Sequence, residues 1–161
     1  MKFSIPYLSG KEKEYVSQAI ESRSISGDGL FTKKCQTWFE NKFGFKKTFL
    51  TTSCTDALEM AAILLDIKGG DEVIVTPYTF IATISAILEV GAMPVFVDID
   101  PETFQMDPGK IEKKITPRTR AILPVHILGL PVDIVKIMEI AKKHSLISFV
   151  WQWDIEYKTV S

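Results

Sequence analysis

Short apolar segments of strand-like composition alternate with segments of helical period along most of this chain. We expect strands at 47–51, 72–76, 94–98, 121–125 and 146–150, with helices at 58–65, 80–90, 107–115 and 134–144 between them. Asp107 and Asp133 are the predicted N-caps of the last two helices. Strands that alternate with helices in this way are typical of a layered α/β fold. The sequence therefore predicts three layers around a mainly parallel sheet, in which ligands bind at the carboxyl ends of the strands.

Two amphipathic helices are predicted before the first strand. Ser9 and Glu12 have the pattern of a capping box at the start of the first helix. The loop between the helices contains Gly27-Asp28-Gly29, for which we expect unusual backbone angles. We expect Tyr15, Val16, Ala19 and Ile20 to form the buried stripe of the first helix, and Cys35, Trp38, Phe39 and Phe43 mark the second.

Charge and composition narrow the classes of partner. The 161 residues carry 19 basic and 20 acidic side chains that are interspersed, so nothing indicates binding to nucleic acid. The most apolar region, Val73–Ile99, is interrupted by proline, glycine and glutamate, which argues against a membrane-spanning helix. Cys35 and Cys54 lack the spacing of a metal site, and no secretory leader is evident, so we expect a cytoplasmic protein without a metal site.

The stretch from Thr51 to Leu58 joins the first predicted strand to a helix. The first N–H groups of a helix lack intrahelical partners and the helix dipole is positive at that end, so a phosphate group is favoured there. Ordinary N-capping by Thr55 explains the same small and polar residues, and the local sequence alone favours that interpretation.

Phe80 follows the second predicted strand, within Pro77-Tyr78-Thr79-Phe80. Its ring belongs either to the core at the start of a buried helix or to a site where it stacks on a planar heteroaromatic ligand. The core interpretation is the more common one for a single aromatic residue. In a parallel sheet, Phe80 would lie at the same edge as residues 51–56, 98–100 and 125–129.

Two further stretches at strand ends carry acid–base groups. Asp98 and Asp100 have the spacing with which many glycosyltransferases hold a metal and a nucleotide-sugar diphosphate. Pro101 follows directly, which favours a turn after the strand. His126 acts either as an acid–base group or as a structural hydrogen-bonding partner of a nearby carbonyl, and the structural role is the more common.

A series of spaced motifs runs from the N-terminus to about Leu146. They are Gly27-Asp28-Gly29-Leu30-Phe31, Ser53-Cys54-Thr55-Asp56-Ala57-Leu58, Gly70-Asp71-Glu72-Val73-Ile74, Pro77-Tyr78-Thr79-Phe80, Gly91-Ala92, Phe96-Val97-Asp98 and Pro124-Val125-His126. In this order and spacing the chain resembles the DegT/StrS sugar aminotransferases.

This resemblance implies the large domain of a fold type I enzyme that uses pyridoxal 5′-phosphate. In that family the cofactor phosphate lies on the helix start matched by Thr55 and Asp56, and the aromatic residue matched by Phe80 stacks on the pyridine ring. Family members transfer an amino group from glutamate to a nucleotide-linked 4-keto-6-deoxy sugar, and the products enter cell-surface glycans such as lipopolysaccharide. The resemblance also implies a homodimer with shared active sites, near whose boundary the loop at 27–31 would lie.

Residues 147–161 depart from the family pattern, so we divide the chain into a partial aminotransferase domain at 1–146 and a divergent tail at 147–161. The family aspartate that pairs with the pyridine nitrogen would fall near Trp151, and no lysine occupies the context of the family's Schiff-base lysine. Amino transfer needs both the amine and the acid at the ring nitrogen. We therefore expect a truncated enzyme from a disrupted reading frame, with no catalytic residue and no activity alone.

Two other functions stay open on the sequence. One is an evolved partial domain that acts as a non-catalytic dimerisation or regulatory module, since a partner could cover an incomplete sheet edge. The other is a metal-dependent nucleotide-sugar transferase that uses Asp98 and Asp100.

Overall fold

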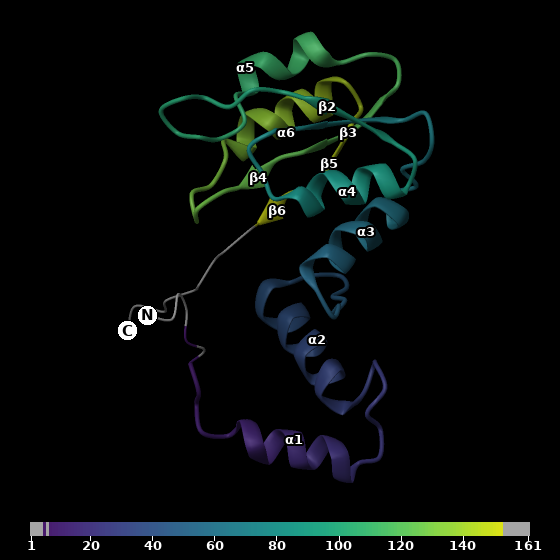
Figure 1. The fold of residues 1–161 in the computed structure, drawn as a ribbon, viewed down its shortest axis with the longest axis vertical. Coiled ribbons are helices and arrows are strands. Elements are labelled where there is room, and N and C mark those ends of the chain that lie inside the picture. The colour runs from purple at the N-terminus through teal and green to yellow at the C-terminus, as the bar shows by residue number, and fades with distance from the viewer. Residues whose placement is uncertain (1–4, 6, 153–161) are drawn as a thin grey trace. The chain divides into compact units, whose positions relative to one another are not determined.

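The computed structural model describes residue 5 and residues 7–152, and the chain forms two compact units, Met1–Thr51 and Thr52–Ser161. Figure 1 shows the elements in the colours of the chain. In order they are α1 (Glu12–Glu21), α2 (Leu30–Phe43), α3 (Cys54–Leu64), β1 (Glu72–Val75), α4 (Ile81–Glu89), β2 (Met93–Phe96), α5 (Pro108–Ile111), the 3₁₀ turn η1 (Glu112–Lys114), β3 (Thr119–Leu123), β4 (Val125–His126), α6 (Ile134–Lys143), β5 (Ile147–Ser148) and β6 (Trp151–Gln152).

The first unit contains α1 and α2, and neither helix includes a buried residue. An edge-to-face contact joins the two helices through Tyr15 and Phe31, whose ring centroids are 5.5 Å apart. The predicted buried stripe on α1 is wrong, because Tyr15, Val16 and Ile20 are all exposed. A unit this short has too little apolar surface to enclose a core of its own.

Of two local predictions in this unit, the capping box is half right, and the unusual backbone angle in the loop at 27–29 is confirmed. The backbone N–H of Ser9 donates to the Glu12 carboxylate, but α1 has no side-chain cap, so half of the expected capping box forms. Asp28 takes the left-handed conformation at φ 63°, whereas Gly29 has an ordinary φ of −74°. The unusual angle therefore falls on the aspartate, a residue that tolerates this region because its short polar side chain can bond locally.

Residues 47–51 do not form the predicted strand. The backbone N–H of Thr48 donates to the carboxylate of Glu40 at 2.9 Å instead of to a neighbouring strand. A strand is stable only beside a partner, and among the described residues no other segment pairs with this one. β-Propensity alone could not show that the partner is missing.

The second unit is built on a four-stranded sheet in the order β2-β1-β3-β5, with all neighbouring strands parallel. Ile74 in β1 lies opposite Val95 in β2 and Ile122 in β3. The strand predicted at 121–125 is interrupted at Pro124, which has no N–H for the ladder, and β4 continues in a second parallel pair with β6. The predicted mainly parallel sheet is confirmed.

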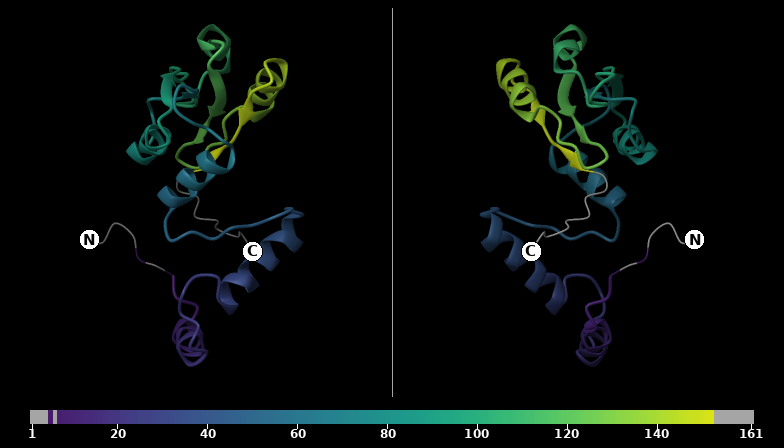
Figure 2. Two further views of the ribbon diagram at one scale, coloured as in Figure 1. Left: turned by 90° about the vertical axis from the view of Figure 1, so that its right-hand side faces the viewer. Right: turned by 90° about the vertical axis from the view of Figure 1, so that its left-hand side faces the viewer.

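Side chains of β1 and β3 alternate between two cores, one on each face of the sheet. Val75 and Leu123 pack with the apolar faces of α3 and α4, and Ile74 packs with α5 and α6. Figure 2 shows α4 and α6 on opposite sides of the strands. The predicted three layers are therefore present, and α5 and α6 begin at the predicted caps Asp107 and Asp133.

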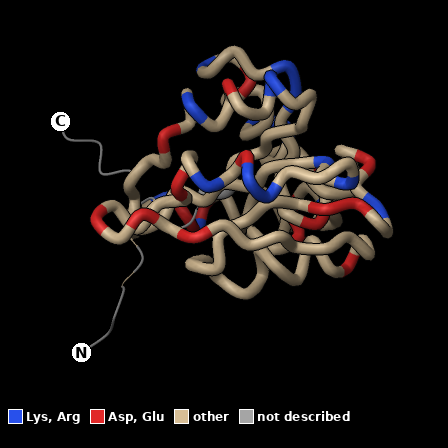
Figure 3. The backbone as a smooth tube through the Cα atoms, turned by 90° about the horizontal axis from the view of Figure 1, so that it is seen from above, with Lys and Arg blue, Asp and Glu red and all other residues tan. Residues whose placement is uncertain are grey.

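Lysine and arginine residues are mixed with acidic residues along the backbone in Figure 3, as the net charge of −1 suggests. Among the described residues, every helix is too short or too polar to cross a membrane.

Candidate functional site

The helices α3 and α4 begin at the same edge of the sheet. They pack against each other. Gly69 follows the end of α3 and Gly91 follows the end of α4, and these two glycines lie close together: a Cβ atom on Gly91 would be 3.3 Å from the Cα atom of Gly69. Because both helices end there, both begin at the opposite edge, where β1 ends and leads through residues 76–80 into α4 (Figure 1). The start of α3 and the loop with Phe80 therefore share the carboxyl edge of the sheet.

Ser53, and not Thr55, is the N-cap of α3. The Ser53 hydroxyl oxygen accepts a hydrogen bond from the backbone N–H of Asp56 at 3.1 Å, and Thr55 is the second residue of the helix. The hydroxyl of Thr52 donates to the Asp56 carboxylate, and this hydrogen bond is the main cause of the lowered pKa of Asp56. Two interactions thus fix the turn that enters the helix.

The donors at this turn suit an anion. The backbone N–H groups of Cys54 and Thr55 are the first two of the helix and have no intrahelical acceptor, and Thr55 also carries a hydroxyl group. Cys54 is exposed at the surface, so this turn is open to a ligand. The donor set and the positive end of the helix dipole fit the phosphate group of a cofactor.

Phe80 is the N-cap residue of α4, and the residue is 49% exposed. Its ring is therefore not enclosed in the core. Two interactions fix the loop before it: the Thr76 hydroxyl accepts the backbone N–H of Tyr78 at 3.2 Å, and the hydroxyls of Thr79 and Thr83 lie 2.9 Å apart. The aromatic side chain of Phe80 therefore lies on a loop that hydrogen bonds hold in place, at the same carboxyl edge of the sheet as the start of α3.

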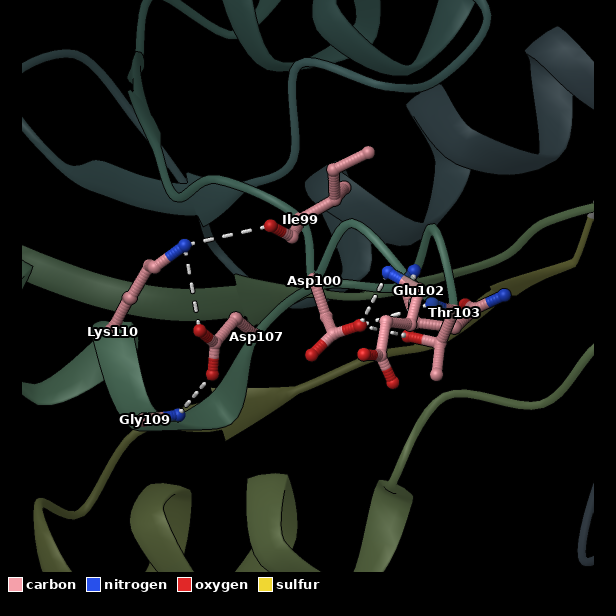
Figure 4. A network of polar contacts seen from close by, with 8 residues as sticks. Ile99, Asp100, Glu102, Thr103, Asp107, Gly109 and Lys110 are labelled. Atoms are coloured by element: carbon pink, nitrogen blue, oxygen red, sulfur yellow. Dashed lines mark hydrogen bonds and ion pairs between the residues drawn. The ribbon is translucent and has the colours of Figure 1, made fainter.

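Asp100 organises a turn after β2 (Figure 4). One of its carboxylate oxygens accepts the backbone N–H groups of Glu102 and Thr103, each at 2.9 Å, and these bonds hold the pKa of Asp100 below its ordinary value. The backbone oxygen of Asp98 accepts the N–H of Asp107 at 3.2 Å. Among the residues described, no three His, Cys, Asp or Glu side chains gather as a metal site. The geometry favours a turn over a metal-binding pair.

His126 also serves the backbone. Its Nδ1 atom accepts the N–H of Val132 at 3.1 Å, and burial lowers the pKa of the imidazole. The structural role is thus the one that the contacts support, although the partner is an N–H group and not the expected carbonyl. The bond ties the end of β4 to the segment that enters α6.

Sequence reasoning missed one aromatic pair at this edge. The rings of Tyr78 and Phe104 lie 5.9 Å apart, and they come from the loops after β1 and β2. Phe104 has a φ of 60°, a conformation that bulky residues rarely adopt. Both residues follow predicted strands, and this position is the feature of the sequence from which the pair could have been predicted.

The sequence of this chain is similar to those of known proteins. Residues 6–150 match the sequence profile of the DegT/DnrJ/EryC1/StrS aminotransferase family. A GDP-perosamine synthase of Escherichia coli O157:H7 is 46% identical over 145 residues, which cover 88% of this chain and 39% of that protein.

Solved structures agree in fold. An aminotransferase from Psychrobacter cryohalolentis matches with a TM-score of 0.83 at 37% identity, over 92% of this chain and 38% of that one. NtdA of Bacillus subtilis, determined with bound cofactor PMP, matches with a TM-score of 0.78 at 31% identity, over 93% of this chain and 37% of that one. The chain thus spans less than two-fifths of the length of these relatives.

Proposed function

Because the chain belongs to the DegT/DnrJ/EryC1/StrS aminotransferase family, we propose that it forms the cofactor-holding part of a sugar aminotransferase domain. Pyridoxal 5′-phosphate is the cofactor of this family, whose structures hold it or its amino form. The observation that carries the proposal is the shared edge at which the open N–H groups of α3 and the exposed ring of Phe80 lie.

We assign the parts of the cofactor to separate groups of this chain. The N–H groups of Cys54 and Thr55 and the Thr55 hydroxyl would hold the phosphate, and the ring of Phe80 would stack on the pyridine. Bound pyridoxal phosphate supplies the electron sink for amino transfer. The chain's own contribution is to bind and orient it, because the braced loop at 76–80 fixes the ring and the α3 turn fixes the phosphate donors.

The substrates that we propose are glutamate and a nucleotide-linked 4-keto-6-deoxy sugar. Likeness to a GDP-perosamine synthase supports a nucleotide sugar, and surface-glycan synthesis in the cytoplasm is the setting we infer. A homodimer is supported by the exposed apolar side chains of α1 and α2, which a second copy would cover: Val16, Ile20, Leu30, Trp38 and Phe43.

We also propose that the 161-residue chain does not catalyse amino transfer by itself. The family's pyridine-pairing aspartate would fall near Trp151, where this chain has no acidic side chain. The bound cofactor needs an acid at its ring nitrogen to act as an electron sink, so binding alone cannot replace that group. Residues 153–161 of the divergent tail lie outside the described part of the chain.

Titration with pyridoxamine 5′-phosphate tests the cofactor site. This form has no aldehyde and so cannot react with surface lysines. We expect calorimetry to show saturable binding that pyridoxamine without phosphate does not reproduce. Phe80→Ala should weaken it by roughly 3–10-fold through loss of stacking, and Phe45→Ala, which removes a ring of similar exposure from the first unit, should leave it unchanged. Binding that ignores the phosphate or Phe80 would contradict the proposal.

A further inference from the structure

We propose that Thr52 and Asp56 act as a clamp that holds the first turn of α3 in the form that receives phosphate, and that Asp56 itself does not contact the phosphate. The inference rests on the cofactor site proposed above. Both would be positioning residues, since they act through the backbone donors between them. The resemblance had placed Asp56 among the cofactor-binding residues, and the contacts assign it this different task.

The clamp consists of two hydrogen bonds that close around the same turn. The Thr52 hydroxyl donates to a carboxylate oxygen of Asp56, and the Asp56 N–H donates to the Ser53 hydroxyl. The N–H groups of Cys54 and Thr55 lie between these contacts in the chain. Fixing both ends of so short a segment restricts the directions in which these N–H groups point, so less conformational entropy is lost when an anion binds.

Asp56 has no donor left to offer a phosphate. Its N–H donates to Ser53, and its carboxylate is ionised at neutral pH, since the hydrogen bond from Thr52 holds its pKa below an already acidic ordinary value. A negative carboxylate repels a phosphate dianion, so the charge of Asp56 opposes binding while its hydrogen bond to Thr52 supports binding. The two effects can be separated, because asparagine keeps an acceptor oxygen for Thr52 and removes the charge.

Four variants of the full chain separate the effects, with pyridoxamine 5′-phosphate as the probe. Thr52→Val breaks the hydrogen bond to Asp56 without changing the charge, and we expect it to weaken binding by about tenfold. Asp56→Ala removes both the bond and the charge, and we expect it to bind about tenfold more weakly than Asp56→Asn, which removes the charge alone. Asp56→Asn should bind within about threefold of the wild type, or more tightly, and Thr52→Ser should restore the affinity because it keeps the hydroxyl. Equal affinity of Thr52→Val and the wild type would overturn the clamp, as would Asp56→Asn binding as weakly as Asp56→Ala.

Amide hydrogen exchange without ligand gives an independent measurement. The N–H of residue 56, which donates to the Ser53 hydroxyl, should exchange faster in Thr52→Val and Asp56→Ala but not in Asp56→Asn, while exchange in β1 and β3 stays unchanged. Unchanged exchange at α3 in the first two variants would refute the clamp whatever the affinities. Failure of the wild type to bind the probe, with exchange as expected, would instead refute the proposed function and leave the clamp standing as a feature of the fold.

Discussion

Single polar residues at the carboxyl edge of the sheet chiefly bind the backbone of their own loops. Asp100 accepts two N–H groups of the turn that follows it, Thr76 accepts the N–H of Tyr78, and His126 accepts the N–H of Val132. Buried or half-buried polar atoms are stable only with such partners. These residues therefore shape the loops from which a ligand would be held.

His126 offers a test of this role through pH. Burial lowers its pKa in the folded chain, so the unfolded chain binds the proton more readily and stability falls as the pH drops below about 6.5. Protonation at Nδ1 would also remove the acceptor for the Val132 N–H, a bond worth about 1 kcal/mol. Asparagine offers an oxygen near the Nδ1 position and does not titrate. We therefore expect His126→Asn to lose less stability than the wild type between pH 7.5 and 5.5, a range that spans the ordinary histidine pKa of about 6.5.

Urea unfolding of both proteins across this range is the measurement. The two proteins differ only at position 126, so the difference between their pH profiles reports on this residue. Identical pH profiles would mean that the pKa of His126 is the same in the folded and the unfolded chain, and the structural role would then lack its pH signature.

The caps show how far the sequence predicts individual residues. Asp107 and Asp133 are caps as predicted, because each directly precedes a clear helical pattern. At α3 the cap is Ser53 and not Thr55, since several successive residues there are suited to capping and only the path of the chain selects one. The hydrogen bond of Asp100 to its own turn was likewise favoured by Pro101 in the sequence.

At the scale of elements, β1 illustrates what pattern alone could not predict. Glu72 lies in this strand with 5% of its surface exposed, and its carboxylate accepts hydrogen bonds from Arg118 and Thr116 near the start of β3. The strand was predicted from its apolar run, but the partners of its buried charge come from more than forty residues away. The prediction of a strand at 47–51 was wrong for the same reason, because strand pairing depends on residues that are distant in the sequence.

The helix α6 gives a prediction at this scale. Ile137 is fully buried against the sheet, whereas Val135 on the same helix is 64% exposed. We expect Ile137→Ala to lower the free energy of unfolding by roughly 2–5 kcal/mol, because it leaves a cavity in the core. Val135→Ala should change it by less than about 0.5 kcal/mol. Denaturant unfolding at neutral pH measures both, and comparable losses in the two variants would contradict the assigned faces of α6.

At the scale of the whole molecule, the two units differ in how they are stabilised. The second unit has two apolar cores on either side of a parallel sheet, and α1 and α2 of the first unit contain no buried residue. Local stability follows the apolar surface that opening exposes. The first unit should therefore open far more often than the sheet unless another surface covers it.

Hydrogen exchange at two protein concentrations tests both parts of this inference. We expect amides of α1 and α2 to exchange at least tenfold faster than those of β1 and β3 in dilute solution, because their opening costs at least about 1.4 kcal/mol less. If a second copy covers Val16, Ile20 and Trp38, higher concentration should slow exchange in α1 and α2 and leave β1 and β3 unchanged, since binding stabilises only the state that binds. Ile20→Glu should abolish the concentration effect, and Glu21→Lys, its exposed neighbour, serves as the control. Exchange that is independent of concentration would refute association through these helices, and their apolar side chains would then need a different partner.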